Sequence, residues 1–203
     1  MFCLREPTDA AWAEKAAMDL DAVLVDHAHC EMKAATNALS LAIRYANDLD
    51  LVKALTDIAQ EELSHFRRVV ELLATRGLAL GAPPVDDYAA QLRRAMKALP
   101  LNDLPFVIDR LLVGALIEAR SCERFKLLLP VLTPDRCSTE MRAFYEELFA
   151  CEARHYREYI DLAKTAAGER AAEVEPRLDR LADAEASIVR GLASREQRGA
   201  VHG

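Results

Sequence analysis

Two short repeats in this sequence combine a carboxylate and an imidazole at a spacing that suits metal binding. Glu62 is followed three residues later by His65, and Glu152 is followed three residues later by His155. On a helix this spacing places both side chains on one face, one turn apart, so that both can reach the same cation. A single pair of this kind often arises by chance, whereas its recurrence favours a metal site.

A further glutamate precedes each pair at a similar distance along the chain. Glu31 comes before the first pair and Glu118 before the second, so the order is Glu, Glu-x-x-His, Glu, Glu-x-x-His. This is the ligand order of di-iron and di-manganese carboxylate four-helix bundles, in which two helices give a Glu each and two give a Glu-x-x-His each. The pattern predicts the metal ligands, which would also be the catalytic residues: Glu31, Glu62, His65, Glu118, Glu152 and His155.

These acidic and imidazole groups occupy positions where an apolar side chain would be expected. An uncompensated carboxylate in the interior is unfavourable unless its pKa shifts and it stays neutral. Two divalent cations would neutralise the four carboxylates, and oxygen and nitrogen ligands without a thiolate suit iron or manganese better than zinc. The alternative is a helical protein with surface glutamates and hydrogen-bonded histidines that holds no metal.

Long helices must present these residues to the interior, and apolar side chains at steps of three and four predict such helices. Bundle helices are expected over about residues 20–47, 51–76, 104–129 and 139–167. A leading helix over 9–18, a short helix carrying Arg93 and Arg94, and an outer helix over about 176–194 are also expected. Glu118 falls on the apolar stripe of its helix and Glu123 does not, so Glu118 is the predicted ligand. We expect one all-α domain over residues 1–203, a four-helix bundle with additional short helices.

The composition is that of a helical protein with a substantial core. The 203 residues are 52% hydrophobic, with only 7 glycines and 8 prolines. The net charge of −7 is unlike that of most nucleic-acid-binding proteins, so contact with a nucleic acid would need a local basic patch. The sequence contains no apolar run long enough to cross a membrane and begins without a signal-peptide pattern. Five cysteines without a Cys-x-x-Cys indicate reduced thiols and a cytoplasmic protein.

Other polar residues carry less specific patterns. His27 lies one turn before Glu31 and would suit a hydrogen-bonding partner or an extra ligand, although a core histidine is the commoner case. His29 lies off the apolar stripe, which predicts exposure to solvent. Cys30 and Cys151 directly precede predicted ligands, but adjacent helical residues point in different directions, so both are expected to be small core residues. Solvated faces are predicted for the basic residues Arg67, Arg68, Arg93, Arg94, Lys97, Arg120, Arg124 and Lys126.

With these motifs identified, the chain resembles the bacterial tRNA hydroxylase family that modifies 2-methylthio-N6-isopentenyladenosine. The resemblance extends over most of the chain and is carried by residues 26–35 (DHAHCEMKAA), 61–66 (EELSHF), 118–125 (EARSCERF) and 152–156 (EARHY). The run over 118–125 is the most distinctive, because the general metal pattern does not require it. The resemblance implies a ferritin-like fold with a non-haem di-iron site formed by the six predicted ligands.

The resemblance also implies a reaction and its partners. The protein would be a di-iron monooxygenase that uses O₂ and an external electron donor to hydroxylate the isopentenyl group of the modified adenosine beside the tRNA anticodon. The expected cofactor is two iron ions (Fe²⁺/Fe³⁺), and the expected partners are tRNA and an electron-transfer protein, with no membrane. The competing hypothesis is a ferritin-like ferroxidase, peroxidase or iron-binding protein without a tRNA substrate. A helical interaction domain without metal is a third possibility, and the oligomeric state stays open.

Overall fold

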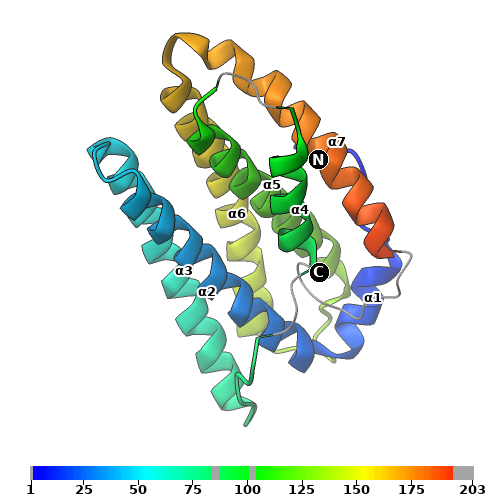
Figure 1. Ribbon diagram of the computed structural model, residues 1–203. Helices are drawn as coiled ribbons and strands as arrows, with labels where there is room; N and C mark the ends of the chain where they lie inside the picture. The colour runs from blue at the N-terminus through cyan, green and yellow to red at the C-terminus, as the bar shows by residue number, and fades with distance from the viewer. Residues whose placement is uncertain (1, 84–86, 101–103, 194–203) are drawn as a thin grey trace. The chain divides into compact units, whose positions relative to one another are not determined.

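The computed structural model describes residues 2–83, 87–100 and 104–193, which are helices joined by short loops, with no strand among them (Figure 1). The chain separates into two compact units. The smaller, here called the hairpin unit, lies within residues 19–85 and contains α2 (Leu20–Arg44) and α3 (Leu49–Thr75). The larger unit contains α1 (Ala11–Met18), α4 (Asp87–Ala98), α5 (Phe106–Leu128), η1 (Leu129–Val131), α6 (Thr139–Ala167), η2 (Gly168–Glu173) and α7 (Val174–Ala193).

The two helices of the hairpin unit pack along each other, and aspartate side chains cap both of their N-termini. Asp19 Oδ1 accepts a hydrogen bond from the backbone N–H of Ala22 at 3.1 Å. Asp48 Oδ1 accepts one from Leu51 N–H at 3.0 Å, which ties the start of α3 to the tight turn after α2. Such caps satisfy backbone donors that have no partner within the helix.

The end of α3 forms a Schellman motif around Gly77, whose φ is +68°. The N–H of Leu78 donates to Leu73 O at 2.9 Å, and the N–H of Gly77 donates to Ala74 O at 3.1 Å. This pair of bonds closes the last turn and requires a left-handed residue, which glycine adopts without steric cost. The helix predicted to end at about residue 76 ends at Thr75.

In the larger unit, α5 and α6 pack side by side, and α1, α4 and α7 contact α5 (Figure 1). Ser138 caps α6 by accepting a hydrogen bond from Met141 N–H at 3.2 Å. The contact between α5 and α6 is close at Gly114, because a Cβ atom there would lie 3.0 Å from the ring of Tyr159. Gly114 lies one turn before Glu118, and Tyr159 lies one turn after His155, so this close approach occurs next to predicted ligands.

Buried ion pairs connect α7 to the rest of the larger unit. Arg177 donates from Nε and Nη2 to the two carboxylate oxygens of Asp109 on α5, at 2.7 and 2.8 Å, and from Nη1 to Pro100 O at 3.0 Å. Glu185 accepts from Arg120 of α5, and both side chains are fully buried. The outer helix, α7, is therefore bound to α5 through charged side chains that are buried and paired, as buried charges usually are.

Most helix boundaries lie within a few residues of the sequence predictions. The helix expected over 20–47 ends at Arg44, and the helix expected from 51 begins at Leu49 because Asp48 is its cap. The last helix begins at Val174 instead of 176, and its expected end at Ser194 lies outside the described residues. In the described part of the chain, no helix is long and apolar enough to span a membrane. All five cysteines are free thiols.

Candidate metal centre

Three predicted ligands come together in the hairpin unit. Glu31 of α2 and Glu62 and His65 of α3 each offer one ligand atom, and these atoms lie within 4.8 Å of one another. His65 Nδ1 is 3.6 Å from Glu31 Oε2 and 3.8 Å from Glu62 Oε2. All three side chains are buried, Glu62 with an exposed fraction of 1%. The helical spacing of Glu62 and His65 places both on the face of α3 that meets α2.

His27 binds the first carboxylate of this cluster. Its Nε2 lies 2.6 Å from Glu31 Oε1, and both side chains are buried. Burial by itself would raise the pKa of Glu31, but hydrogen bonds with the side chains of Glu62, His27 and His65 outweigh it and lower this pKa to about 2. Glu31 is therefore an ionised carboxylate at neutral pH, and His27 donates the hydrogen bond that orients it.

The other three predicted ligands come together in the larger unit. Glu118 of α5 and Glu152 and His155 of α6 also offer ligand atoms within 4.8 Å of one another. His155 Nδ1 lies 3.9 Å from Glu152 Oε2, and the imidazole is completely buried. Glu118 and Glu152 are 4% and 3% exposed. The same nitrogen of the histidine, Nδ1, thus faces carboxylate oxygens in both units.

The donor atoms of each cluster fit a metal site. Each cluster presents two buried carboxylates and one imidazole nitrogen, and buried acids in this number need cations or protons to offset their charge. Oxygen and nitrogen donors without a thiolate favour iron or manganese over zinc. The buried glutamate and histidine clusters therefore fit a di-iron site.

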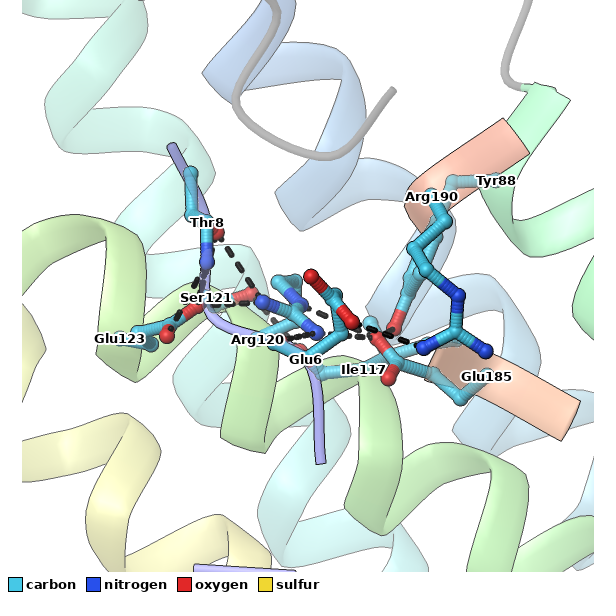
Figure 2. A network of polar contacts seen from close by, with 9 residues as sticks. All are labelled: Glu6, Thr8, Tyr88, Ile117, Arg120, Ser121, Glu123, Glu185 and Arg190. Carbon is cyan, nitrogen blue, oxygen red and sulfur yellow. Dashed lines mark hydrogen bonds and ion pairs between the residues drawn. The ribbon is translucent and has the colours of Figure 1, made fainter. Parts of the chain in front are cut away.

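Glu123, which the sequence pattern excluded as a ligand, has a different role (Figure 2). Its carboxylate accepts hydrogen bonds from Thr8, at 2.7 Å from Oγ1 and 3.3 Å from the backbone N–H, and forms an ion pair with Arg120. Arg120 also donates to Thr8 Oγ1 at 3.0 Å and to Glu185 Oε1 at 2.7 Å. Figure 2 shows these side chains converging on the guanidinium group two residues after Glu118.

A tyrosine completes this buried network. Tyr88 of α4 donates its hydroxyl to Glu185 Oε1 at 3.0 Å. Burial raises the pKa of both Tyr88 and Glu185, against the opposing effect of the Arg120 charge. The network joins the N-terminal segment, α4, α5 and α7, and so holds the part of α5 that carries Glu118.

Sequence reasoning misplaced several charged or polar residues. The prediction that Arg120 and Arg124 lie on solvated faces was wrong, since they are 0% and 8% exposed, and Arg124 lies over the ring of Trp12. His29, expected in solvent, is buried with Nε2 3.2 Å from Leu80 O. Their partners come from distant segments of the chain, which helical periodicity does not reveal.

Cys151 is a contact of the candidate site that sequence reasoning missed. It was expected to be a small core residue, and it is indeed buried, but its Sγ lies 3.6 Å from His155 Nε2. The signal was present in the spacing of four residues, which places Cys151 and His155 on one helical face.

Comparison with known proteins shows the family of this chain. The model of the family described as tRNA-(MS[2]IO[6]A)-hydroxylase (MiaE) matches residues 1–199. The chain belongs to this family. The resemblance seen in the four sequence motifs is thereby confirmed. The residues that match the MiaE family model include both clusters of two glutamates and one histidine, and the Glu118–Phe125 run.

Two relatives of this MiaE-family chain carry the same name, tRNA 2-(methylsulfanyl)-N(6)-isopentenyladenosine(37) hydroxylase. The Pseudomonas putida protein is 43% identical over 157 residues, which are 77% of this chain and 73% of that protein. The Salmonella typhimurium protein is 30% identical in an alignment that covers 90% of this chain and 82% of that protein.

A solved structure is similar over nearly the whole chain. It is described as Protein 43 with aldehyde deformylating oxygenase activity from Synechococcus, and it matches with a TM-score of 0.79 and 37% identity. The match covers 91% of this chain and 88% of that one. The expected fold class, an all-α ferritin-like bundle with additional short helices, is confirmed.

Proposed function

We propose that this protein is a tRNA hydroxylase, an O₂-dependent monooxygenase that acts on 2-methylthio-N6-isopentenyladenosine in tRNA. Membership of the MiaE family over residues 1–199 carries the proposal, and two relatives named for this activity support it. The reaction replaces one C–H bond of the isopentenyl group by C–OH. The second oxygen atom of O₂ leaves as water, with two electrons from an external donor and two protons.

The proposed centre comprises the two clusters acting together as ligands of two iron ions. The six residues would be Glu31, Glu62, His65, Glu118, Glu152 and His155. Four carboxylates balance the charge of two divalent cations, which explains how so many acids are tolerated in the interior. Activation of O₂ for insertion of an oxygen atom into an unactivated C–H bond is the chemistry that two iron ions supply in such a site.

The side chains around the proposed ligands have two tasks, orientation and exclusion of water. His27 donates to Glu31 and holds this carboxylate ionised and fixed in direction. The near-complete burial of Glu62 and His155 keeps bulk water away, which protects a reactive oxidant from side reactions. An electron-transfer protein is the proposed source of the two electrons.

The tRNA must be bound by a surface whose charge differs from that of the whole protein. The net charge of −7 opposes a polyanion, so the proposed contact is made by a local group of arginine and lysine side chains. The modified base would leave its stack to reach a buried centre. Because the proposed substrate is tRNA, the proposed location is the cytoplasm.

The decisive experiment is a reconstitution with purified components. The protein is loaded anaerobically with Fe²⁺, supplied with a chemical reductant and tRNA that carries the modified adenosine, and then exposed to O₂. Mass spectrometry of the digested nucleosides should show the gain of one oxygen atom, derived from ¹⁸O₂ when the labelled gas is used. The matched control is the Glu118→Ala protein treated in the same way. Absence of the oxygenated nucleoside with iron-loaded wild-type protein would refute the substrate assignment.

Two further arms distinguish the competing functions. Rapid oxidation of many Fe²⁺ ions per chain without tRNA, together with a native mass that indicates a large cage, would favour ferritin-like iron handling. An aldehyde supplied in place of tRNA tests the activity named for the Synechococcus protein, and its expected result here is no loss of the formyl group.

A further inference from the structure

We propose that the outer face of α4 binds phosphate groups of the tRNA through Arg93, Arg94 and Lys97, which together are here called the α4 patch. The inference rests on the proposed function, which names tRNA as the substrate, and it adds the surface that holds this substrate. A polyanion that meets a protein with a net charge of −7 needs a local cationic surface of this kind.

The packing of α4 in the larger unit determines where the α4 patch points (Figure 1). Tyr88, Leu92 and Met96 follow one another at intervals of four residues and are at most 2% exposed. They hold one face of the helix against its neighbours, α5 and α7. The helical period then places the three cations on the opposite face, and all three side chains are exposed.

No acid offsets the positive charge of the α4 patch. Its three side chains form no ion pair with another residue that the structure describes, and Asp87 in the first turn is the only acid of the helix. On other helices, exposed arginines pair with a glutamate four residues later: Arg67–Glu71, Arg142–Glu146 and Arg154–Glu158. In α4 the residue four positions after Arg93 is Lys97, and like charges at this spacing destabilise a helix. A polyanion bound there would offset this repulsion.

The chemistry of the α4 patch favours a nucleic acid over an acidic protein. Among the described residues, none of the exposed large apolar side chains lies in α4. Interfaces between proteins have an apolar centre, whereas interfaces with nucleic acids are more polar and much more positive. Two of the three cations are arginines, whose planar guanidinium group can bind a phosphate through two parallel hydrogen bonds. The phosphate backbone of tRNA is the partner that these properties fit.

Buried hydrogen bonds connect α4 to the helix that carries Glu118. Tyr88 of α4 donates to Glu185 Oε1 at 3.0 Å, and Arg120 of α5 donates to the same oxygen at 2.7 Å (Figure 2). A phosphate on the α4 patch is therefore held by the compact unit that contains one of the two proposed ligand clusters. Phosphate contacts set the register of a nucleic acid on a protein without reading its sequence, so the α4 patch contributes affinity and orientation.

The test is the binding of fluorescently labelled tRNA that carries the modified adenosine, measured by anisotropy over a series of salt concentrations. The patch variant combines three substitutions: Arg93→Gln, Arg94→Gln and Lys97→Gln. The matched control combines three others: Lys15→Gln, Lys53→Gln and Lys126→Gln. Both variants lose the same charge at exposed positions, but the control loses it on three different helices.

We expect the patch variant to bind tRNA about 10–100-fold more weakly near 0.1 M salt. The slope of log K against log salt concentration should become shallower by about 2–3, which is nearly one for each lost phosphate contact. The control should keep the slope of the wild-type protein.

Thermal unfolding of both variants shows whether the fold is kept. Lys97→Gln alone should reduce the slope by about one and serves as the test if the patch variant does not fold. Wild-type affinity and slope in a folded patch variant would overturn the inference and leave an acidic protein as the occupant of this face. A wild-type protein that does not bind the modified tRNA at all would instead overturn the proposed function.

Discussion

The contact between Gly114 and Tyr159 allows a prediction whose magnitude follows from the structure. A Cβ atom at position 114 would lie 3.0 Å from Cε1, 3.0 Å from Cζ and 3.1 Å from Cδ1 of the tyrosine ring. The ring is 1% exposed and must move by a few tenths of an ångström inside a packed core. Overpacking of this kind costs about 1–3 kcal/mol.

Gly114→Ala also brings a gain, because alanine is favoured over glycine inside a helix by about 0.8–1.0 kcal/mol. The difference leaves Gly114→Ala destabilised by about 0–2 kcal/mol. In a Tyr159→Leu background the clash disappears, so the same change should stabilise the protein by up to about 1 kcal/mol. The double-mutant cycle should therefore give a coupling free energy of about 1–3 kcal/mol.

Urea unfolding of wild type, both single variants and the double variant measures this coupling. Gly191→Ala on α7 is the control, since a Cβ there meets nothing within 4 Å and only the helical gain of up to about 1 kcal/mol should remain. Equal effects of Gly114→Ala with and without the tyrosine ring would refute the argument from close approach. A destabilised Gly191→Ala would show that the helix-propensity reasoning itself does not apply to this protein.

Three further predictions concern the buried charges, the thiols and the metal. Asp109→Ala should lower the free energy of unfolding by roughly 3–5 kcal/mol, because it leaves Arg177 buried without its carboxylate. Urea unfolding should show a much smaller loss when Asp109→Leu is combined with Arg177→Met, since no buried charge then remains. Burial, reinforced by the charge of Glu152, raises the pKa of Cys122 to about 12 from 9.0. At pH 8 its thiolate fraction should therefore be on the order of a thousand-fold lower than that of a thiol with the ordinary pKa. Iodoacetamide should modify Cys137 well before Cys122. Equal alkylation of the two cysteines in the native protein, followed by mass spectrometry of peptides, would contradict that burial. Fe²⁺ or Mn²⁺ at 100 times its dissociation constant should raise the free energy of unfolding by about 2.7 kcal/mol. A chelator should abolish this increase in wild type and should change the stability of Glu62→Ala very little.

The helices and the candidate ligands were predictable because their signals are local. Glu62 and His65, like Glu152 and His155, share a face through their spacing alone. The helix predicted over about 51–76 lies within two residues of α3, Leu49–Thr75. Each cluster then follows from packing one glutamate-bearing helix against one Glu-x-x-His helix. The joint action of the two clusters on two iron ions remains a proposal.

The burial of two arginines was not predictable from local sequence signals. Arg120 was predicted to lie on a solvated face, yet it is buried, as is Arg177. Each is paired with a carboxylate that is distant in the sequence. Glu185 is 65 residues from Arg120, and Asp109 is 68 residues from Arg177. No periodicity connects such positions, so a solvated and a buried arginine look alike in the sequence.

The sequence alone determined where the helices lie, to within a few residues, and which acids and imidazoles share a helical face, because these properties depend on neighbours within a turn or two. Only the tertiary structure decided which of the remaining polar groups acquire partners. It brought Arg120 and Glu185 together in the interior, and it turned the ring of His155 so that Nε2 meets Cys151 while Nδ1 faces Glu152. The physical reason is that burial of a polar group is tolerated only where a complementary group is also present, and packing between helices sets that condition.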